Sequence, residues 1–374
     1  MKLADARDGL LVYIGGHRVG KLAQMANGLV AFQYDEEWRK TGFSLNPYSL
    51  PLSDEVFVPD ANPFAGLFGV FHDSLPDGWG ALLLDRMLRR EGINPVTVTP
   101  LMRLAIVGST GKGALRYEPE TEFPREFYGR DLDQLAQWCS DILEDKPTDK
   151  LDEAFAAGGS SGGARPKAYV EDDEGSWLVK FPSSLDPAGI GRIEYDYALC
   201  ARTCGIRMPD VRLMPSKLCE GYFATKRFDR KPDGTRRHMV SASGIVEVSH
   251  RIPMLDYENL FQISYFLTGG REDAEQLFRL MCFNVFAHNH DDHSNNFSWV
   301  FDQGRWEMSP AYDLTFSQGL GGEHATTVLG NGKPGMNDVI DLACKVGLSV
   351  RKARAIATEI QATCQDLLNL HGLA

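Results

Sequence analysis

Apolar positions near the start of the chain change from a strand-like to a helical spacing. Between residues 9 and 34, short apolar runs alternate with glycines and polar turns, which predicts short strands. A cluster of proline, aspartate and glycine at 76–78 has the composition of a helix start. The leucines and the methionine at 82–88 then follow at helical spacing until Gly92, so we expect a helix that packs on the first sheet. A further helical pattern lies at 131–143.

The later apolar runs predict more strands and a mostly helical end. Two strand-like runs, KAYVE at 167–171 and SWLVKF at 176–181, are joined by the acidic turn DDEG and predict a hairpin. A second strand pair is expected at 211–217 and 222–230. The run 275–289 has helical spacing and precedes the most polar segment of the chain.

The composition is that of an ordinary soluble, enzyme-sized protein. The 374 residues are 43% hydrophobic, which is enough for two lobes with a cleft between them. The first residues lack the features of a signal peptide, and no apolar run approaches the roughly 20 residues of a membrane span, so we expect a cytoplasmic protein without membrane attachment. The net charge of −12 argues against broad binding to nucleic acid. The basic run 229–238 is interpreted as a solvated hairpin, with local contact to nucleic acid as the alternative.

Cysteine usage supports neither a disulfide framework nor a zinc ribbon. There are seven cysteines, an odd number, and no two of them form a C-x-x-C pair. They stand at Cys139, Cys200, Cys204, Cys219, Cys282, Cys344 and Cys364. We therefore expect reduced, mostly buried thiols.

The segment HNHDDH at 288–293 can be interpreted as a metal-binding site. It fits the H-x-H-x-D-H ligand pattern of binuclear metallo-hydrolases at every fixed position. Those folds also need histidine and aspartate ligands from later strands, yet only His324 and His371 follow, in a tail with a helical pattern. The sequence therefore favours a different chemistry here, and we interpret His288 and His290 as structural residues.

A glycine- and serine-rich stretch, AAGGSSGGARPK at 156–167, suits phosphate binding. Glycines let backbone N–H groups approach phosphate oxygens because no Cβ blocks the way. Lys180 lies in the apolar strand that follows, where an ammonium group needs an anionic partner such as Glu194 or ATP phosphates. This order of loop, strand lysine and helix glutamate is that of the protein-kinase N-lobe. The run GSTGKGA at 108–114 lacks P-loop spacing, and we interpret it as a turn with a solvated lysine.

Residues 291–313 match the catalytic spacing of protein kinases. In kinases the catalytic aspartate precedes a metal-binding asparagine by five residues, and a metal-binding aspartate follows after a short hairpin. Asp291 and Asn296 have this spacing. The run FSWVFDQGRWEMSP predicts two strands around the turn DQGR and leads to Asp313 in AYDL. The sequence therefore predicts a proton acceptor at Asp291 and metal ligands at Asn296 and Asp313.

Five motifs resemble those of the HipA family of serine/threonine-protein kinase toxins from bacterial toxin–antitoxin modules. They are GGSSGGARPK, WLVKFP, KRFDR, HNHDDHSNNFS and PAYDL, in this order, and LPDGWG is similar to the amino-terminal subdomain of the same family. The resemblance implies an α+β, two-lobed protein-kinase-like fold with an N-terminal β-rich subdomain at 1–125. The kinase domain would span 126–374, with the nucleotide loop and sheet to about 230 and a helical lobe with the catalytic loop after it.

The resemblance also implies roles for individual residues. Asp291 would be the catalytic base, Asn296 and Asp313 the Mg²⁺ ligands, and Lys180 would hold the nucleotide phosphates. The nucleotide-binding residues would be Gly162, Gly163, Ala164, Arg165, Pro166, Lys167, Lys180, Lys226, Arg227, Phe228, His293, Asn296, Tyr312 and Asp313. Two features depart from the family pattern: the carboxyl end is short, and Asp292 stands where a glycine is common.

By the same resemblance, we expect ATP and Mg²⁺ as cofactors and a protein substrate such as an aminoacyl-tRNA synthetase. Ser160, or Ser161 beside it, would be autophosphorylated. A helix-turn-helix antitoxin of the HipB type would be the partner, and DNA would be bound only through it. Two alternatives stay open: a pseudokinase that binds ATP and regulates transcription with the antitoxin, and a metal-dependent hydrolase that uses HNHDDH.

Overall fold

The computed structural model of the chain describes residues 3–6, 8–122, 131–187 and 189–368. It divides into two compact units, here termed unit 1 (Met1–Gly191 with Arg212–Val240) and unit 2 (Arg192–Val211 with Ser241–Ala374). The expected boundary after residue 125 lies outside the described residues and stays a prediction. Each unit contains both helices and strands, as the α+β class requires. Every helix in the described ranges is too short or too polar to span a lipid bilayer.

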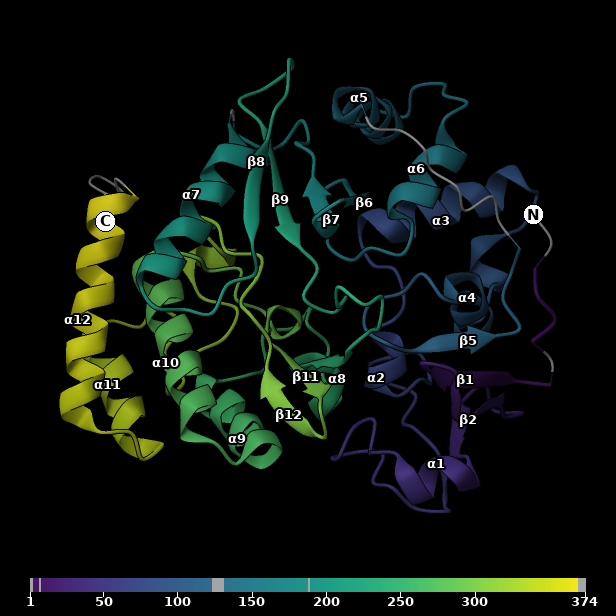
Figure 1. The fold of residues 1–374 in the computed structure, drawn as a ribbon, viewed down its shortest axis with the longest axis horizontal. Coiled ribbons are helices and arrows are strands. Elements are labelled where there is room, and N and C mark those ends of the chain that lie inside the picture. The colour runs from purple at the N-terminus through teal and green to yellow at the C-terminus, as the bar shows by residue number, and fades with distance from the viewer. Residues whose placement is uncertain (1–2, 7, 123–130, 188, 369–374) are drawn as a thin grey trace. The chain divides into compact units, whose positions relative to one another are not determined.

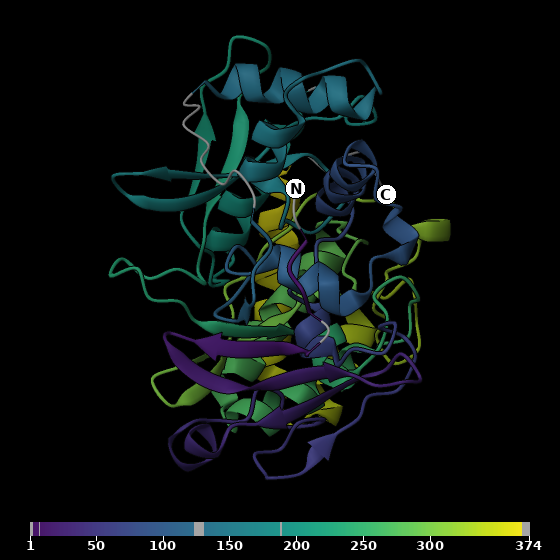
Figure 2. The ribbon, with the colours of Figure 1, turned by 90° about the vertical axis from the view of Figure 1, so that its right-hand side faces the viewer.

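Unit 1 begins with a five-stranded sheet in the order β4-β3-β2-β1-β5, and all its paired neighbours are antiparallel. Its strands are β1 (Leu10–Ile14), β2 (His17–Gln24), β3 (Val30–Tyr34), β4 (Val56–Phe57) and β5 (Arg116–Glu118). The first three confirm the short strands predicted at 9–34, and Figure 2 shows the purple strands of this sheet side by side. Leu10, Val12, Leu22 and Phe32 are fully buried, because alternate side chains of a strand point to the same face.

Short helices follow this sheet in unit 1. They are α1 (Glu36–Thr41), α2 (Gly69–His72), α3 (Trp79–Arg90), the 3-10 helix η1 (Pro95–Thr97), α4 (Pro100–Val107), α5 (Leu132–Leu143) and α6 (Leu151–Gly158). α3 and α5 confirm the helices predicted at 82–88 and 131–143. The start of α4 is determined locally, because the Thr99 side chain accepts a hydrogen bond from the Met102 N–H and Pro100 has the backbone geometry of a first helical residue.

The second sheet of unit 1 has the order β6-β7-β9-β8 (Figure 1). Its strands are β6 (Lys167–Asp172), β7 (Gly175–Lys180), β8 (Val211–Met214) and β9 (Tyr222–Lys226). β6 and β7 form the predicted hairpin. Trp177, Val179 and Tyr222 pack in one core with side chains of α3, α5 and α6. The expectation that α3 packs on the first sheet is therefore wrong, since its buried Trp79 and Leu83 belong to the core of the second sheet.

Unit 2 is mostly helical. Its elements are α7 (Ile190–Thr203), α8 (Ala242–Val246), α9 (Tyr257–Thr268), α10 (Arg271–Phe286), the 3-10 helix η2 (Ser294–Asn296), β11 (Ser298–Asp302), β12 (Arg305–Met308), the 3-10 helix η3 (Leu320–Gly322), α11 (Met336–Lys345) and α12 (Val350–Leu367). The chain enters it at β10 (His238–Ser241). α10 is the helix predicted at 275–289, and α9, α11 and α12 pack against it (Figure 1). β11 and β12 form the predicted hairpin, with Asp302 paired to Arg305.

Candidate functional site

The loop after α10 carries the predicted catalytic residues of unit 2. α10 ends at Phe286, and His288 adopts a left-handed φ of 54°, which turns the chain away from the helix. The side chain of Asn289 is buried and donates a hydrogen bond to Oδ1 of Asn284 at 2.9 Å. The loop is therefore attached to the last turns of α10 before it reaches Asp291.

Asp291 and Asn296, the pair predicted from its spacing, are in contact. Nδ2 of Asn296 donates a hydrogen bond to the backbone oxygen of Asp291 at 2.7 Å. The short turn η2 brings the chain back to Asp291, and its start is capped by Nδ1 of His293, which accepts a hydrogen bond from the Asn295 N–H at 3.3 Å. The side chain of Asp291 is 64% exposed, so a hydroxyl group can approach its carboxylate.

The β11–β12 hairpin returns the chain to this loop at Tyr312 and Asp313. The Tyr312 hydroxyl donates a hydrogen bond to the backbone oxygen of Asn295 at 2.7 Å and lies 2.5 Å from Oγ of Ser298. Asp313 has a left-handed φ of 55°, a conformation that aspartate adopts more readily than most residues. Its carboxylate is close enough to His293 to interact with it electrostatically.

His293 lies beside both predicted catalytic aspartates. Its Nε2 is 3.9 Å from Oδ1 of Asp291. Burial lowers the pKa of His293 and His250 lowers it further, whereas Asp291 and Asp313 oppose the shift. The imidazole is therefore neutral at pH 7, and it does not cancel the charge of either carboxylate.

The oxygen atoms of this loop suit a hard divalent cation. Mg²⁺ prefers carboxylate and amide oxygens, which Asp313 and Asn296 supply. Asn296 uses its amide nitrogen on the Asp291 backbone, which leaves the amide oxygen for a ligand. The donor set therefore fits the Mg²⁺ site that the sequence predicts at Asn296 and Asp313.

Asp292, the departure from the family pattern, is the buried anchor of the loop. Its carboxylate is fully buried, and Oδ2 accepts hydrogen bonds from the Tyr257 hydroxyl at 2.8 Å and from Nδ1 of His324 at 2.9 Å. Oδ1 accepts a hydrogen bond from the Thr326 N–H at 3.2 Å. Asn284 donates to the Tyr257 hydroxyl at 2.9 Å, which links this network to α10. His324 lies between η3 and α11, outside any helix, so the expectation of a helical tail is wrong at this residue.

The alternative metal pattern HNHDDH is not gathered into one cluster. Nδ1 of His290 bonds with the backbone oxygen of Gln318 at 2.9 Å, and Asp292 belongs to the buried network above. Within the described part of the chain, three or more His, Cys, Asp or Glu side chains lie close enough to share a metal ion only at Cys200, Cys204 and Cys364. His371 lies outside the described residues.

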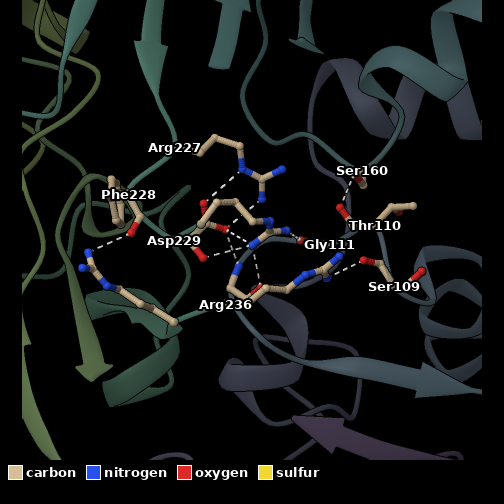
Figure 3. A network of polar contacts seen from close by, with 11 residues as sticks. Ser109, Thr110, Gly111, Ser160, Arg227, Phe228, Asp229 and Arg236 are labelled. Atoms are coloured by element: carbon tan, nitrogen blue, oxygen red, sulfur yellow. Dashed lines mark hydrogen bonds and ion pairs between the residues drawn. The ribbon is translucent and has the colours of Figure 1, made fainter. Parts of the chain in front are cut away.

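In unit 1, Ser160 and Ser161 are buried at the end of α6, directly before the predicted phosphate loop. The Ser160 hydroxyl donates a hydrogen bond to the Thr110 carbonyl at 2.9 Å, and Figure 3 shows the two groups pointing toward each other. The Ser161 hydroxyl donates to the Gly158 carbonyl at 2.6 Å. Ser160 therefore joins the loop to the GSTGKGA turn, whereas Ser161 closes the end of α6.

The glycines of LPDGWG allow the start of α3 to approach the phosphate loop. The Trp79 N–H donates a hydrogen bond to the Gly163 carbonyl at 2.8 Å. Gly78 has a φ of 51°, and a Cβ there would overlap the Gly163 carbonyl and lie 2.9 Å from the nitrogen of Ala164. A Cβ at Gly80 would overlap the carbonyl of Ser161. Backbone contact between these two segments is therefore possible only because side chains are absent.

Lys167 and Lys180 are buried and lie opposite each other on β6 and β7, so their side chains share one face of the sheet. A Cβ at Gly163 would lie 2.7 Å from Nζ of Lys167, and Nζ of Lys180 lies 5.5 Å from the centre of the Phe223 ring. Two buried ammonium groups beside a glycine-rich loop favour the binding of an anion. Glu194 is buried in unit 2, and its pairing with Lys180 stays a prediction.

A buried carboxylate next to β9 organises the GSTGKGA turn (Figure 3). Asp229 accepts hydrogen bonds from Arg227 at 2.8 Å, from Arg230 at 2.7 Å and from the Gly113 N–H at 2.8 Å. Burial works against ionisation of Asp229, but the neighbouring guanidinium groups outweigh it and lower its pKa to about 2. The carboxylate is therefore ionised at pH 7 and holds this turn through Gly113.

The basic run 229–238 forms the expected hairpin, in which Arg230 pairs with Arg236 and residues 232–235 are exposed. Its arginines, however, bond to unit 1 instead of being solvated. Arg230 donates to the Gly111 carbonyl at 2.8 Å, and Arg236 donates to the Ser109 carbonyl at 2.5 Å. Arg237 donates to the Phe228 carbonyl at 3.0 Å. The sequence shows an acidic residue among arginines there, but it does not show that their partners are backbone carbonyls of a distant turn.

Two arginines predicted to bind nucleotide have their guanidinium groups occupied within unit 1. Nε of Arg165 donates to Asp186 at 2.8 Å. Arg227 bonds Asp229 and lies 4.2 Å from the centre of the Tyr169 ring. At the other end of the loop, the Pro166 carbonyl accepts a hydrogen bond from the Phe181 N–H at 2.8 Å. Lys112 reaches the loop from the GSTGKGA turn, with Nζ 3.6 Å from a Cβ at Gly162.

Comparisons with known proteins match most of the chain to one family. A family model described as the HipA-like C-terminal domain matches residues 159–368, and one described as the HipA N-terminal domain matches residues 10–118. A chain from the complex of the Shewanella oneidensis MR-1 toxin–antitoxin system HipA, HipB and its operator DNA has a TM-score of 0.68 at 17% identity. That match covers 96% of this chain and 97% of the other. The Helicobacter pylori proinflammatory kinase CtkA has a TM-score of 0.35 at 10% identity and covers 55% of this chain and 94% of its own.

The Asp292 network predicts a stability difference between two adjacent aspartates. Asp292→Asn should lower the free energy of unfolding by roughly 2–3 kcal/mol, because an amide cannot accept all the hydrogen bonds that the buried carboxylate receives. Asp291→Asn, at the exposed neighbour, should change it by about 0.5 kcal/mol or less. Urea unfolding of both variants measures the difference, and equal stability would contradict the anchoring role of Asp292.

Proposed function

This chain belongs to the HipA family, and we propose that it is a toxin that transfers the γ-phosphate of ATP to a serine or threonine hydroxyl of a protein. Its fold is the HipA-like, kinase-like α+β fold that the sequence predicts. The observation that carries the proposal is the hydrogen bond from Asn296 to the Asp291 backbone, with Asp313 close by. This is the set of groups that a kinase catalytic loop needs.

In the proposed reaction, Asp291 is the general base. The substrate hydroxyl oxygen attacks the γ-phosphorus in line with the leaving oxygen, and its proton passes to the Asp291 carboxylate. The bond between the γ-phosphorus and the bridging oxygen breaks, and ADP leaves. The exposure of Asp291 supports this role, because the substrate is itself a protein and needs access. The Asn296 contact holds the Asp291 backbone in place during the transfer.

Other groups in the proposal bind the nucleotide. Asn296 and Asp313 would hold Mg²⁺, which neutralises charge on the phosphates, and His293 and Tyr312 would support these ligands. In unit 1, the phosphates would be bound by Lys180, by Lys167 and by backbone N–H groups of residues 162–165. The hinge at 226–228 would contact adenine through its backbone, because the Arg227 guanidinium is occupied by Asp229.

Two substitutions test the proposed catalytic and metal-binding roles. Asp291→Asn should lower phosphoryl transfer about a hundredfold or more while leaving Mg²⁺-dependent ATP binding nearly intact, because the base does not contact the nucleotide. Asp313→Asn should lower both transfer and Mg²⁺-dependent ATP binding, because it removes a metal ligand. Transfer is measured with γ-labelled ATP and cell lysate, and binding by calorimetry with and without Mg²⁺.

Asp366→Asn, an exposed aspartate on α12, is the matched control and should behave like the wild type in both assays. Turnover of Asp291→Asn at the wild-type rate would show that the catalytic loop is assigned wrongly. Transfer that is absent in the wild type, with ATP still bound, would instead favour the pseudokinase alternative.

We also propose a helix-turn-helix antitoxin of the HipB type as the partner and an aminoacyl-tRNA synthetase as the protein substrate. Membership of the HipA family supports the antitoxin. The synthetase is what the resemblance of the sequence motifs implies. The fold shared with a HipA chain from a complex with HipB and operator DNA supports the first. DNA would be bound through the antitoxin, because this chain carries a net charge of −12 and several arginines of its basic run 229–238 are used within unit 1.

The charge distribution predicts weak DNA binding by the isolated chain. DNA phosphates repel an acidic surface, so operator DNA should bind tightly only after the antitoxin is added. Fluorescence anisotropy of labelled operator DNA, titrated at two salt concentrations with the chain alone and with the complex, measures this. Tight and salt-sensitive binding by the chain alone would contradict the indirect mode.

Autophosphorylation of Ser160 is the proposed regulatory reaction. The Ser160 hydroxyl donates to the Thr110 carbonyl, so phosphorylation would remove the donor and place a charge of about −1.5 to −2 against a carbonyl oxygen. Because that contact cannot persist, the phosphorylated segment would leave its place beside the GSTGKGA turn. Flanking glycines allow this movement at little steric cost. Ser161 is the alternative acceptor, although its hydroxyl is bonded within the end of α6.

Mass spectrometry after incubation with ATP and Mg²⁺ tests the Ser160 assignment. Phosphate should appear on the wild type and on Ser161→Ala, and it should be absent from Ser160→Ala and from Asp291→Asn. The last variant shows that the modification is the protein's own chemistry. Phosphate on neither serine, while a second protein is phosphorylated in the same tube, would contradict autophosphorylation at this loop.

A further inference from the structure

Three cysteine thiols meet in the interior of unit 2. Cys200 lies on α7, and Cys204 follows directly after its end, with its N–H bonded to the Cys200 carbonyl at 2.9 Å. Cys364 comes from the last turn of α12. All three are buried, with at most 1% of each residue exposed. Their sulfur atoms all lie within 4.8 Å of one another. The cluster is therefore made by the packing of α12 near α7 and not by any spacing along the chain.

The surroundings of the thiols are polar enough to accept a charged group. The Cys200 thiol donates to the Thr363 carbonyl at 3.9 Å, so a backbone oxygen lies next to the three sulfurs. Nη1 of Arg279 donates to the Cys204 carbonyl at 3.0 Å, which places a cation near the cluster.

The geometry favours a shared ligand over a disulfide. A disulfide would join two of the sulfurs and leave the third unused, whereas all three are mutually close. Two sulfurs bound to one Zn²⁺ at about 2.3 Å lie roughly 3.8 Å apart, so the cluster needs to contract by about 1 Å or less. Two ligands one turn apart on a helix face the same ion, as they do in helical zinc motifs.

We propose that Cys200, Cys204 and Cys364 bind one thiophilic divalent cation of the Zn²⁺ class. Each thiol that is protonated beforehand loses its proton to solvent when its sulfur binds, and three thiolates with one divalent cation leave a net charge of −1. The Thr363 carbonyl or a water molecule completes the four ligands that Zn²⁺ prefers. Access is through the last turn of α12, because helix ends fray.

A bound cation would link α12 to α7. Because α7 contacts the base of the predicted catalytic loop, the cation would also restrict the movement of that loop. The Tyr197 hydroxyl on α7 donates to the Ala287 carbonyl at 2.8 Å, directly after α10 ends. A cation that holds α7 in place therefore also holds the base of the loop that carries Asp291. The expected result is higher thermal stability of the folded chain in the presence of the metal, since only the folded state brings the three sulfurs together.

Titration with Co²⁺ and Zn²⁺ tests the site on the full chain. The protein is reduced, treated with a chelator and desalted under nitrogen, and Co²⁺ is added while the thiolate-to-cobalt absorption in the near ultraviolet is followed. We expect one Co²⁺ per chain, displaced by one Zn²⁺. Cys200→Ala, Cys204→Ala and Cys364→Ala should each lose the absorption. Cys139→Ala, equally buried on α5 of unit 1, and Cys344→Ala, exposed on α11, should retain it.

Thermal unfolding in the presence and absence of Zn²⁺ keeps the test decisive if a variant folds poorly. The wild type and the two control variants should gain melting temperature with Zn²⁺, and the cluster variants that fold should not. No cobalt absorption in the reduced wild type would overturn the site. Absorption that persists in all three cluster variants, or that is lost equally in Cys139→Ala, would overturn it as well. So would an intramolecular disulfide among these cysteines that forms in air and is the only change detected by mass spectrometry.

Discussion

The buried carboxylate of Asp292 is the constraint on which the predicted catalytic loop depends. A fully buried charge is tolerated only when hydrogen bonds replace its lost hydration, and here they come from Tyr257 on α9 and from His324 and Thr326 before α11. These partners lie far apart along the chain, so the carboxylate holds three segments together. Its neighbour Asp291 stays exposed. A buried residue therefore holds the backbone next to an exposed one, the proposed general base.

In unit 1, a second buried carboxylate holds a different loop through hydrogen bonds. Asp229 is buried, ionised and surrounded by arginines, and it bonds the backbone of the GSTGKGA turn at Gly113. That turn in turn accepts the hydrogen bond of Ser160 through Thr110 (Figure 3). The chain of contacts from Asp229 to Ser160 links the end of β9 with the segment before the phosphate loop. The HipA N-terminal domain, matched at 10–118, is thus in direct contact with the loop that the C-terminal domain contributes.

The glycines at 78 and 80 show how this contact is possible. Each lies against a backbone carbonyl of the segment 161–163, and any side chain would force the two segments apart. At Gly78 the left-handed φ adds a second reason for glycine, since residues with a Cβ rarely adopt it. Read from sequence, this cluster indicates only a helix start. Its second role, as the surface that the segment 161–163 contacts, depends on a neighbour that local sequence does not reveal.

The sequence by itself determined the features that depend on a few neighbouring residues. The strands near the N-terminus, α3, α5, α10, the β6–β7 and β11–β12 hairpins, and the contact of Asp291 with Asn296 all follow from local spacing, because helix and strand periods and short turns act over a few positions. Only the tertiary structure decided where distant side chains meet. It placed Asp292 with His324, Ser160 with Thr110, and Cys364 with Cys200 and Cys204. Packing decides such pairs because many arrangements of the same helices and strands bury similar apolar area, and a single sequence does not show which one satisfies every buried polar group.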